Sequence, residues 1–228
     1  MTAWRLDLTY SATGRQAPFT LACQASWQAR ATGLYGPSGS GKTTLLEILL
    51  GLREKRRVRG LIEVGGRRLV DSAAGLTVPS TQRRFGWVPQ DGSLFPHLTV
   101  ESNLRYGAPR TTDPTDVVQL LELTPLLGRR TAELSGGERQ RAALGRALLA
   151  PHDALLLDEP FAALDPRRRS ALLGYVRRIV DERQTPIIYV SHDWSEIRAL
   201  CSFVLVLDRG RLVAQGTPSD VEHVALAI

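Results

Sequence analysis

The stretch GLYGPSGSGKTTLLEILLGL, residues 33–52, has the residue types and spacing of a loop that binds phosphate groups. Its Gly-x-x-x-x-Gly-Lys-Thr pattern, residues 36–43, would rarely arise by chance in a chain of this composition. Lys42 suits the role because a compact ammonium on a flexible stem reaches between phosphates where a planar guanidinium would not fit. The loop's backbone N–H groups and the positive end of the next helix would hold the phosphates, with the Thr43 hydroxyl on Mg²⁺.

The run ALLLDEP, residues 154–160, brings two acidic side chains to the carboxyl end of a predicted buried strand. Ligands bind at that end of open α/β sheets, and buried carboxylates are costly unless a cation or a proton transfer uses them. Asp158 suits a Mg²⁺ ligand, and Glu159 suits a base for an attacking water. The alternative is a strand that ends in ordinary solvated acidic residues, and the phosphate loop upstream weighs against it.

A second candidate anion site lies in LSGGERQRAALGRALL, residues 134–149. Ser135 is a good N-cap, and the glycines after it expose backbone N–H groups at the start of a predicted helix. The chain has one lysine-bearing phosphate loop, so a further helix start offering Ser135 and Gly137 makes most sense against another nucleotide, across a dimer. The alternative is a capped helix with a flexible entry.

The elements that must position these residues follow from the apolar periodicity. Strand and helix patterns alternate at both ends of the chain, which predicts a largely parallel sheet, and the mostly helical middle predicts an inserted lobe. We predict one domain over 1–228, with an α/β core over 1–90 and 151–228 and a helical lobe over 91–150. The predicted strands cover residues 5–10, 19–25, 31–35, 60–64, 85–90, 154–160, 186–193 and 203–216. The predicted helices cover residues 42–52, 115–123, 136–149, 167–183 and 194–200.

Bulk composition limits the class of protein. The chain has 228 residues with 43% hydrophobic content, which is enough for one sizeable core and too much for a disordered chain. No apolar run approaches the roughly 18 residues of a membrane-spanning helix and the N-terminus lacks a signal pattern, so we expect a cytosolic protein.

Cys23 and Cys201 are too few for a disulfide framework and are expected as reduced thiols. The net charge of +6 comes with scattered arginines, among them Arg83 and Arg84, which we expect on solvated faces.

From Trp4 to Asp220 the sequence resembles an ABC-type ATPase subunit, because the motifs of that family occur in the right order. They are GPSGSGKTT (Walker A), VPQDG (Q-loop), LSGGE (signature), LLLDEP (Walker B), AALD (D-loop) and IIYVSHD (switch histidine). The resemblance implies a P-loop, RecA-like α/β core with a mostly parallel sheet and antiparallel N-terminal strands, plus an inserted α-helical lobe. Glu138 stands where the family often has glutamine, which is a common variation.

The resemblance also implies a role for each matching residue. Glu159 would act as the base and His192 would contact the γ-phosphate, with Gln90 as a further catalytic residue. The Mg²⁺ ligands would be Thr43, Gln90 and Asp158. ATP would be contacted, by one copy or its partner, through Gly36, Pro37, Ser38, Gly39, Ser40, Gly41, Lys42, Thr43, Thr44, Ser135, Gly136, Gly137, Glu138 and Asp165.

Adenine would need an aromatic partner. Tyr10 is the candidate for stacking because it follows the first predicted strand, and Phe19 is a weaker alternative. Stacking reads the π-face of a base and discriminates poorly between purines.

A narrower resemblance lies in residues 66–107, GRRLVDSAAGLTVPSTQRRFGWVPQDGSLFPHLTVESNLRYG, which look like the ATPase of molybdate importers. Importers of other inorganic anions, metals or thiamine share parts of this stretch. ATPases of molybdate importers often carry a C-terminal oxyanion-binding domain, and this chain ends soon after LVAQGTPSDV. The sequence therefore leads us to expect no regulatory oxyanion site on this subunit.

The implied machine is a head-to-tail dimer that closes on two MgATP and powers a separate membrane permease. The middle lobe would dock on a cytoplasmic helix of that permease, and a solute-binding protein would act indirectly. We expect the chain in the cytoplasm, peripheral on the inner face of the membrane, importing molybdate or a related oxyanion. Sulfate, iron and thiamine stay open as alternative cargoes.

Other classes of protein fit the sequence less well. A soluble ABC ATPase could bind nucleic acid through the arginine patches, but the chain has a single cassette and no room for long coiled-coil arms between Walker A and the signature. We therefore expect no nucleic-acid partner. A small GTPase or kinase would need a guanine-reading Asn-Lys-x-Asp or an acceptor site; the first is absent from the sequence, and the signature would have no explanation.

Overall fold

The computed structural model describes residues 2–12, 18–162 and 164–228. The chain forms two compact units, the first made of Met1–Arg84 with Pro186–Ile228 and the second of Phe85–Thr185. The second unit is larger than the helical lobe predicted over 91–150, because it also includes a pair of parallel strands and the helix that follows them. The boundaries predicted from the sequence stay a prediction.

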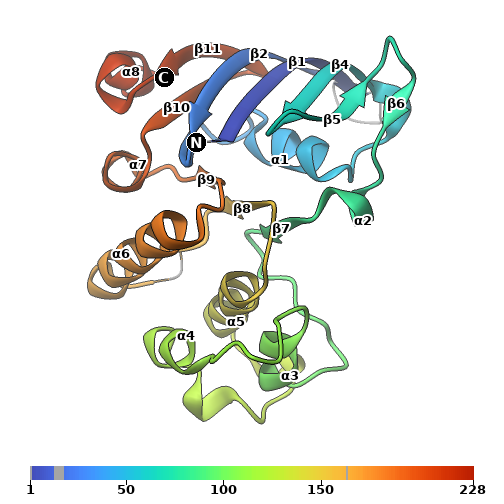
Figure 1. The fold of residues 1–228 in the computed structure, drawn as a ribbon. Helices are drawn as coiled ribbons and strands as arrows, with labels where there is room; N and C mark the ends of the chain where they lie inside the picture. Colours follow the sequence, from blue (N-terminus) through green and yellow to red (C-terminus); the bar gives the residue numbers. More distant parts are fainter. Residues whose placement is uncertain (1, 13–17, 163) are drawn as a thin grey trace. The chain divides into compact units, whose positions relative to one another are not determined.

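The first unit is built on a sheet with the strand order β6-β5-β4-β1-β2-β11-β10-β3-β9 (Figure 1). The N-terminal strands pair antiparallel, whereas β3 pairs in parallel with both β9 and β10. The strands are β1 (Thr2–Ala12), β2 (Phe19–Ala29), β3 (Ala31–Tyr35), β4 (Val58–Val64), β5 (Arg67–Asp71), β6 (Leu76–Thr77), β9 (Ile187–Val190), β10 (Phe203–Asp208) and β11 (Arg211–Gly216).

The core of the first unit follows from the two-residue period of its strands. Side chains on β1 alternate between buried and exposed, so one face carries the apolar set Trp4, Leu6, Leu8 and Tyr10. Trp27 on β2 stacks on Trp4 with ring centroids 5.7 Å apart. This face is therefore a continuous apolar layer.

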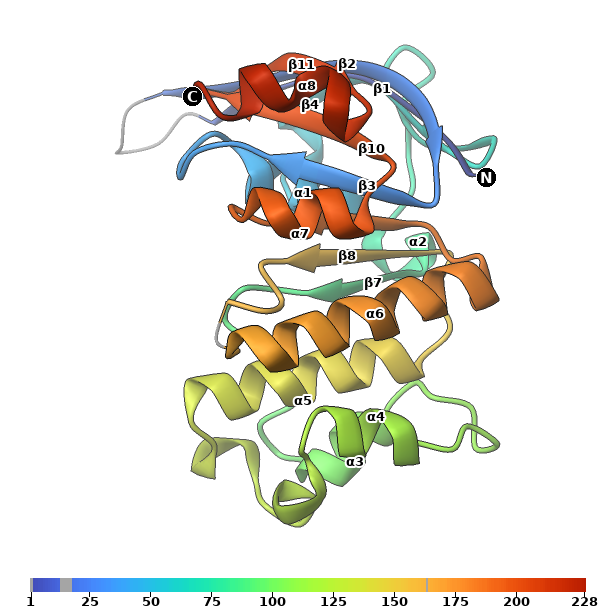
Figure 2. The ribbon, with the colours of Figure 1, turned by 90° about the vertical axis from the view of Figure 1, so that its left-hand side faces the viewer.

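Short helices accompany the sheet of the first unit. In Figure 2, α7 lies along β3, and α8 lies along β10 and β11, with which it makes contact. The helices are α1 (Lys42–Leu50), α2 (Ser80–Arg83), α7 (Trp194–Leu200) and α8 (Pro218–Ala225), with a 3-10 turn η1 (Lys55–Arg57). Helix α1 begins directly after the glycine-rich loop, so the fold presents that loop at a helix N-terminus.

The second unit places helices around two parallel strands, β7 (Phe85–Val88) and β8 (Ala154–Asp158), which pair from Phe85↔Ala154 to Val88↔Leu157. Helix α5 packs against α3, α4 and β7. The helices are α3 (Val100–Arg105), α4 (Thr115–Leu120), α5 (Gly136–Leu149) and α6 (Pro166–Arg183), with 3-10 turns η2 (Thr124–Leu126) and η3 (Thr131–Glu133).

The predicted α/β fold, with a mostly parallel core and antiparallel N-terminal strands, is confirmed. The sequence missed β5, β6, α2, α3 and α8, most of which are too short to show a period. Helix α8 did carry a signal, because Thr217 and Asp220 form a capping box around Pro218. The run 203–216 is a hairpin rather than one strand, since the chain reverses through left-handed conformations at Arg209 and Gly210.

Among the helices that the structure describes, none combines the length and the hydrophobicity needed to cross a bilayer.

Candidate functional site

The glycine-rich loop connects β3 to α1 and requires glycine at its ends. Gly36 has φ 149°, and a Cβ there would lie 2.0 Å from the carbonyl oxygen of Leu207. Gly41 has φ 105° and precedes α1, and a Cβ there would lie 2.9 Å from a Leu21 methyl group. Only glycine tolerates both the backbone conformation and this close packing. The loop geometry thus explains two of the residues that define the motif.

Lys42 is held against the loop. Its ammonium donates hydrogen bonds to the carbonyl oxygens of Gly36 at 2.7 Å and Pro37 at 2.9 Å, and the residue is 8% exposed. Ser40 is also buried, and its hydroxyl oxygen has no hydrogen-bond partner among the described residues. A buried polar atom of this kind can be satisfied by a ligand or by water. The loop therefore presents a positive charge and a hydroxyl group in addition to its backbone N–H groups.

The remaining predicted loop residues are accessible. Pro37, Ser38, Gly39 and Thr43 are exposed, and Thr44 is half-buried. A ligand can therefore reach the outer side of the loop.

Tyr10 is wrongly predicted as an adenine-stacking residue. It lies within β1 on the buried face, with 3% of its surface exposed, and the Arg53 guanidinium lies 5.9 Å from its ring centroid. Sequence position suggested a residue after the strand, whereas β1 extends to Ala12 and its alternation turns Tyr10 inward. Phe19, the weaker alternative, is half-buried, and its ring lies 3.0 Å from where a Cβ on Gly41 would stand.

The predicted switch histidine follows β9 in the first unit and is exposed. Its two neighbours are fixed: the Asp193 N–H donates to the Ser191 hydroxyl at 3.0 Å, and that hydroxyl donates to the buried Glu196 carboxylate at 2.7 Å. Tyr189 also donates to Glu196, at 2.5 Å. The backbone on either side of the exposed His192 is therefore held by hydrogen bonds.

Arg83 contradicts the prediction that the arginine pairs lie on solvated faces. It is 1% exposed, and its guanidinium donates to the carbonyl oxygens of Ile48 at 2.7 Å, Leu49 at 2.6 Å and Val78 at 3.0 Å. The last carbonyls of a helix have no partner within the helix, so an arginine that reaches them caps α1. Burial, with a smaller effect of Arg67, lowers the pKa of Arg83 to about 10. No local sequence signal marked this role.

The acidic strand end lies in the second unit. Asp158 closes β8 and is 3% exposed, and Glu159 follows it half-buried. Glu159 has φ 49°, a left-handed conformation that costs a non-glycine residue roughly 1–2 kcal/mol. Its carboxylate accepts a long hydrogen bond of 3.4 Å from the Gln90 amide. Gln90 and Glu159, both predicted as catalytic, are therefore neighbours within this unit.

The signature segment forms the start of α5. The Ser135 hydroxyl accepts from the Glu138 N–H at 3.3 Å, and the Glu138 carboxylate accepts from the Ser135 N–H at 2.7 Å, which makes a capping box. These hydrogen bonds hold the pKa of Glu138 below its ordinary value. Ser135 and Gly136 are exposed, and Gly137 is half-buried. The helix start predicted as a partner-facing site is thus ordered and accessible.

Asp165, predicted in the D-loop, is the N-cap of α6. Its carboxylate accepts from the Arg168 N–H at 3.2 Å and pairs with the Arg168 guanidinium at 3.2 Å. Ala163, within the same motif, lies outside the described residues. The structure thus gives Asp165 a local role in starting a helix.

The predicted site residues are divided between the units. The first unit holds the phosphate loop and His192, and the second holds Gln90, the acidic strand end and the signature helix start. The donors predicted for Mg²⁺ are the oxygens of a hydroxyl, an amide and a buried carboxylate, which is the chemistry that this ion prefers.

A family model described as ABC transporter matches residues 25–162. The chain therefore belongs to the ABC transporter family, and the predicted resemblance is confirmed. Over 213 residues it is 50% identical to the Molybdenum import ATP-binding protein ModC of Mesorhizobium japonicum, covering 91% of this chain and 57% of that protein. The protein of the same name from Rhizobium etli is 42% identical over 222 residues, covering 95% of this chain and 62% of that protein.

The chain thus spans about three fifths of the length of these curated relatives. A solved structure described as the ATP binding subunit of an ABC transporter superposes with a TM-score of 0.76 at 26% identity. The match covers 98% of this chain and 93% of that one. The fold of the chain is accordingly the fold of that ATP binding subunit.

Proposed function

We propose that this chain is the ATP-hydrolysing subunit of an ABC importer whose cargo is molybdate or a related oxyanion. The observation that carries the proposal is the 50% identity, over 91% of the chain, to a protein named for molybdenum import. The ordered phosphate loop supports the ATP-binding part. The cargo rests on the likeness to the relatives.

The glycine-rich loop that contains Lys42 binds the phosphates of ATP. Its charge offsets the phosphates, and the backbone N–H groups at the start of α1 add hydrogen bonds and the positive helix end. Mg²⁺, when bound, would be held by Thr43, Gln90 and Asp158 and would offset the charge of the phosphates. Glu159 takes the proton from the attacking water, and His192 contacts the γ-phosphate.

A second copy of the chain completes the nucleotide site. The α5 start, with its exposed Ser135 and Gly136, offers N–H groups and the positive end of a 14-residue helix to an anion. If the start of α5 contacts the γ-phosphate of the ATP that is bound to the other copy, ATP links the two copies. ATP binding would then drive closure, and hydrolysis through Glu159 would release it.

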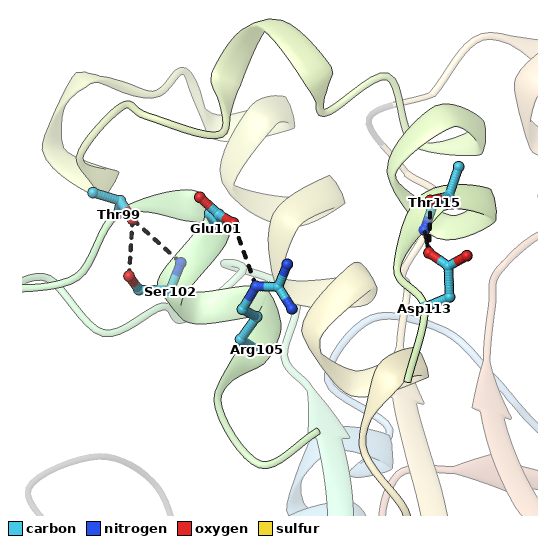
Figure 3. A network of polar contacts seen from close by, with 6 residues as sticks. All are labelled: Thr99, Glu101, Ser102, Arg105, Asp113 and Thr115. Carbon is cyan, nitrogen blue, oxygen red and sulfur yellow. Dashed lines mark hydrogen bonds and ion pairs between the residues drawn. The ribbon is translucent and has the colours of Figure 1, made fainter. Parts of the chain in front are cut away.

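The permease would dock on the helices of the second unit, which places the chain peripherally on the inner face of the membrane. Two apolar hollows, of 310 and 200 Å³, lie there and share Leu104, Arg105 and Pro114 in their linings. Figure 3 shows the polar contacts beside them: Glu101 pairs with Arg105 at 3.3 Å on α3, and Asp113 accepts from Thr115 at 2.6 Å. Apolar hollows with polar side chains beside them suit the apolar face of an amphipathic helix.

Transport in cells tests the cargo. A strain lacking this chain and any other molybdate transporter should lose molybdoenzyme activity at trace molybdate and regain it in excess molybdate. The wild-type gene should restore activity at trace molybdate, and a Lys42→Ala gene should not. Normal molybdoenzyme activity in the deletion strain would refute molybdate as the cargo, and growth tests with limiting sulfate, iron or thiamine would then separate the alternatives.

A further inference from the structure

Gln140 is a buried polar residue of α5 that reaches the end of β8. It is 5% exposed, and its amide donates a 2.8 Å hydrogen bond to the backbone carbonyl oxygen of Glu159, 19 positions along the chain. A buried amide donor needs a hydrogen-bond acceptor. For Gln140 that acceptor belongs to Glu159, the residue proposed as the catalytic base. The contact joins the signature helix to the Walker B strand end within one compact unit.

The Glu159 backbone is where such a contact has most effect. Its φ of 49° is unfavourable for a residue with a side chain and persists only if the surroundings enforce it. The same carbonyl oxygen also accepts from the Ala162 N–H, at 3.3 Å. The direction of this peptide group fixes the direction in which the Glu159 side chain leaves the backbone. Gln140 therefore helps to hold the carboxylate direction.

The loop that carries Gln90 touches the same residue. At Gly92, with φ 62°, a Cβ would lie 2.8 Å from both the N and Cα atoms of Gln140, so the loop passes directly against the α5 backbone. The Gln90 amide in turn lies 3.4 Å from the Glu159 carboxylate. Gln140 thus contacts the backbone of Glu159, and it also contacts the loop that carries Gln90. The Gln90 amide donates to the Glu159 side chain.

We propose that Gln140 is a positioning residue for Glu159, through which the signature helix sets the efficiency of the base. The inference rests on the proposed function, in which Glu159 accepts the proton of the attacking water. Helix α5 begins at Gly136, so Gln140 lies about one turn from the end proposed to meet the partner's nucleotide. A shift of that helix end would reach the Glu159 backbone through a single hydrogen bond.

Gln140→Met tests the inference, because methionine keeps the length and bulk of the side chain but cannot donate. Steady-state ATP hydrolysis should show a kcat lower by roughly 10- to 100-fold, as expected for a misplaced catalytic group, with KM for ATP changed less than about two-fold. Gln28→Met, the same change at an exposed position on β2, is the matched control and should keep wild-type kcat. A wild-type kcat in Gln140→Met would overturn the inference.

A double variant separates positioning from a general structural effect. In a Glu159→Gln background the carboxylate is gone, so adding Gln140→Met should lower the residual rate less than about two-fold. The same 10- to 100-fold fall in both backgrounds would show that Gln140 acts elsewhere. If Gln140→Met does not fold, Gln140→Asn keeps a buried amide that is too short to reach, and the same loss of kcat and non-additivity are expected.

Different results would refute the role of Glu159 as the base and the role of Gln140 as a positioning residue. Glu159→Gln with wild-type turnover would refute Glu159 as the base, and the positioning role with it. Loss of turnover in Glu159→Gln combined with full turnover in Gln140→Met would refute only the positioning role.

Discussion

The ammonium of Lys42 donates a hydrogen bond to the carbonyl oxygen of Gly36, 2.7 Å away, so this bond joins the two ends of the phosphate loop. Gly36 is a position where any side chain would collide with the Leu207 carbonyl. The conformation of the loop therefore depends on its glycines and on the hydrogen bond from Lys42.

Replacing Lys42 tests whether this loop binds ATP. Lys42→Ala should lower ATP affinity by roughly 100-fold or more and abolish turnover, because charge-assisted hydrogen bonds to phosphate are lost. Nucleotide titration and phosphate release measure the two effects. Lys55 is the only other lysine in the sequence, and Lys55→Ala should leave both unchanged. Unchanged ATPase activity in Lys42→Ala would mean that the loop is not the nucleotide site.

Blocking the base should trap the dimer. Glu159→Gln keeps the size of the side chain but removes the proton acceptor, so turnover should fall roughly 10²- to 10⁴-fold while nucleotide binding survives. ATP should then accumulate as the link between copies. Light scattering should show Glu159→Gln as a monomer without nucleotide and as a dimer with ATP.

Adding Ser135→Arg to Glu159→Gln tests the contact in trans. A bulky side chain at the exposed start of α5 should block the partner's γ-phosphate and return the protein to monomer, while ATP still binds. Loss of the Ser135 cap costs about 1 kcal/mol, so a melting curve must confirm that the double variant is folded. Continued dimerisation with ATP would show that the signature helix does not face the partner's nucleotide.

Substitutions of Tyr10 and Phe19 test which of the two residues contacts adenine. Because the Tyr10 ring is buried, Tyr10→Phe should leave ATP affinity within about two-fold of wild type. Phe19→Ala should weaken the binding of ATP by about 5- to 150-fold, the effect of losing one stacked base, without weakening the binding of inorganic triphosphate. Binding titrations with both ligands check this. Equal weakening of the two ligands would mean that Phe19 shapes the phosphate loop instead of contacting adenine.

Arg83 should be essential for stability. Arg83→Met leaves buried carbonyls at the end of α1 without their donor, and we expect a loss of about 2–4 kcal/mol in the free energy of unfolding. Urea denaturation measures it. The exposed Arg56 is the control, and Arg56→Met should shift stability by less than about 0.5 kcal/mol. Equal midpoints for the two variants would contradict the capping role.

Glu138 should make part of the stability depend on pH. Hydrogen bonds from Ser135 lower the pKa of the folded carboxyl, so its contribution is present above the unfolded pKa and is lost as pH falls through the folded value. Wild type should exceed Glu138→Gln in melting temperature near neutral pH, and the gap should close from about pH 4 downward. A gap that stays constant to about pH 3 would show that the charge of Glu138 does not contribute.

The sequence by itself determined what depends on neighbours along the chain. The loop at 36–43 needs glycine where φ is positive, Ser135 and Asp165 cap the helices that follow them, and apolar periods mark most of the strands and helices. These properties follow from backbone sterics and hydrogen bonds within a few residues. The phosphate loop, the acidic strand end and the signature helix could therefore be located without a structure.

Only the tertiary structure decided which distant residues meet. Tyr10 is buried because its strand presents that face to the core, and Arg83 leaves solvent because it reaches the carbonyl end of a helix more than 30 positions away. Gln140 acquired its partner, Glu159, in the same way. Burial and long-range hydrogen bonds are set by packing between elements, and no local pattern of residue types contains that information.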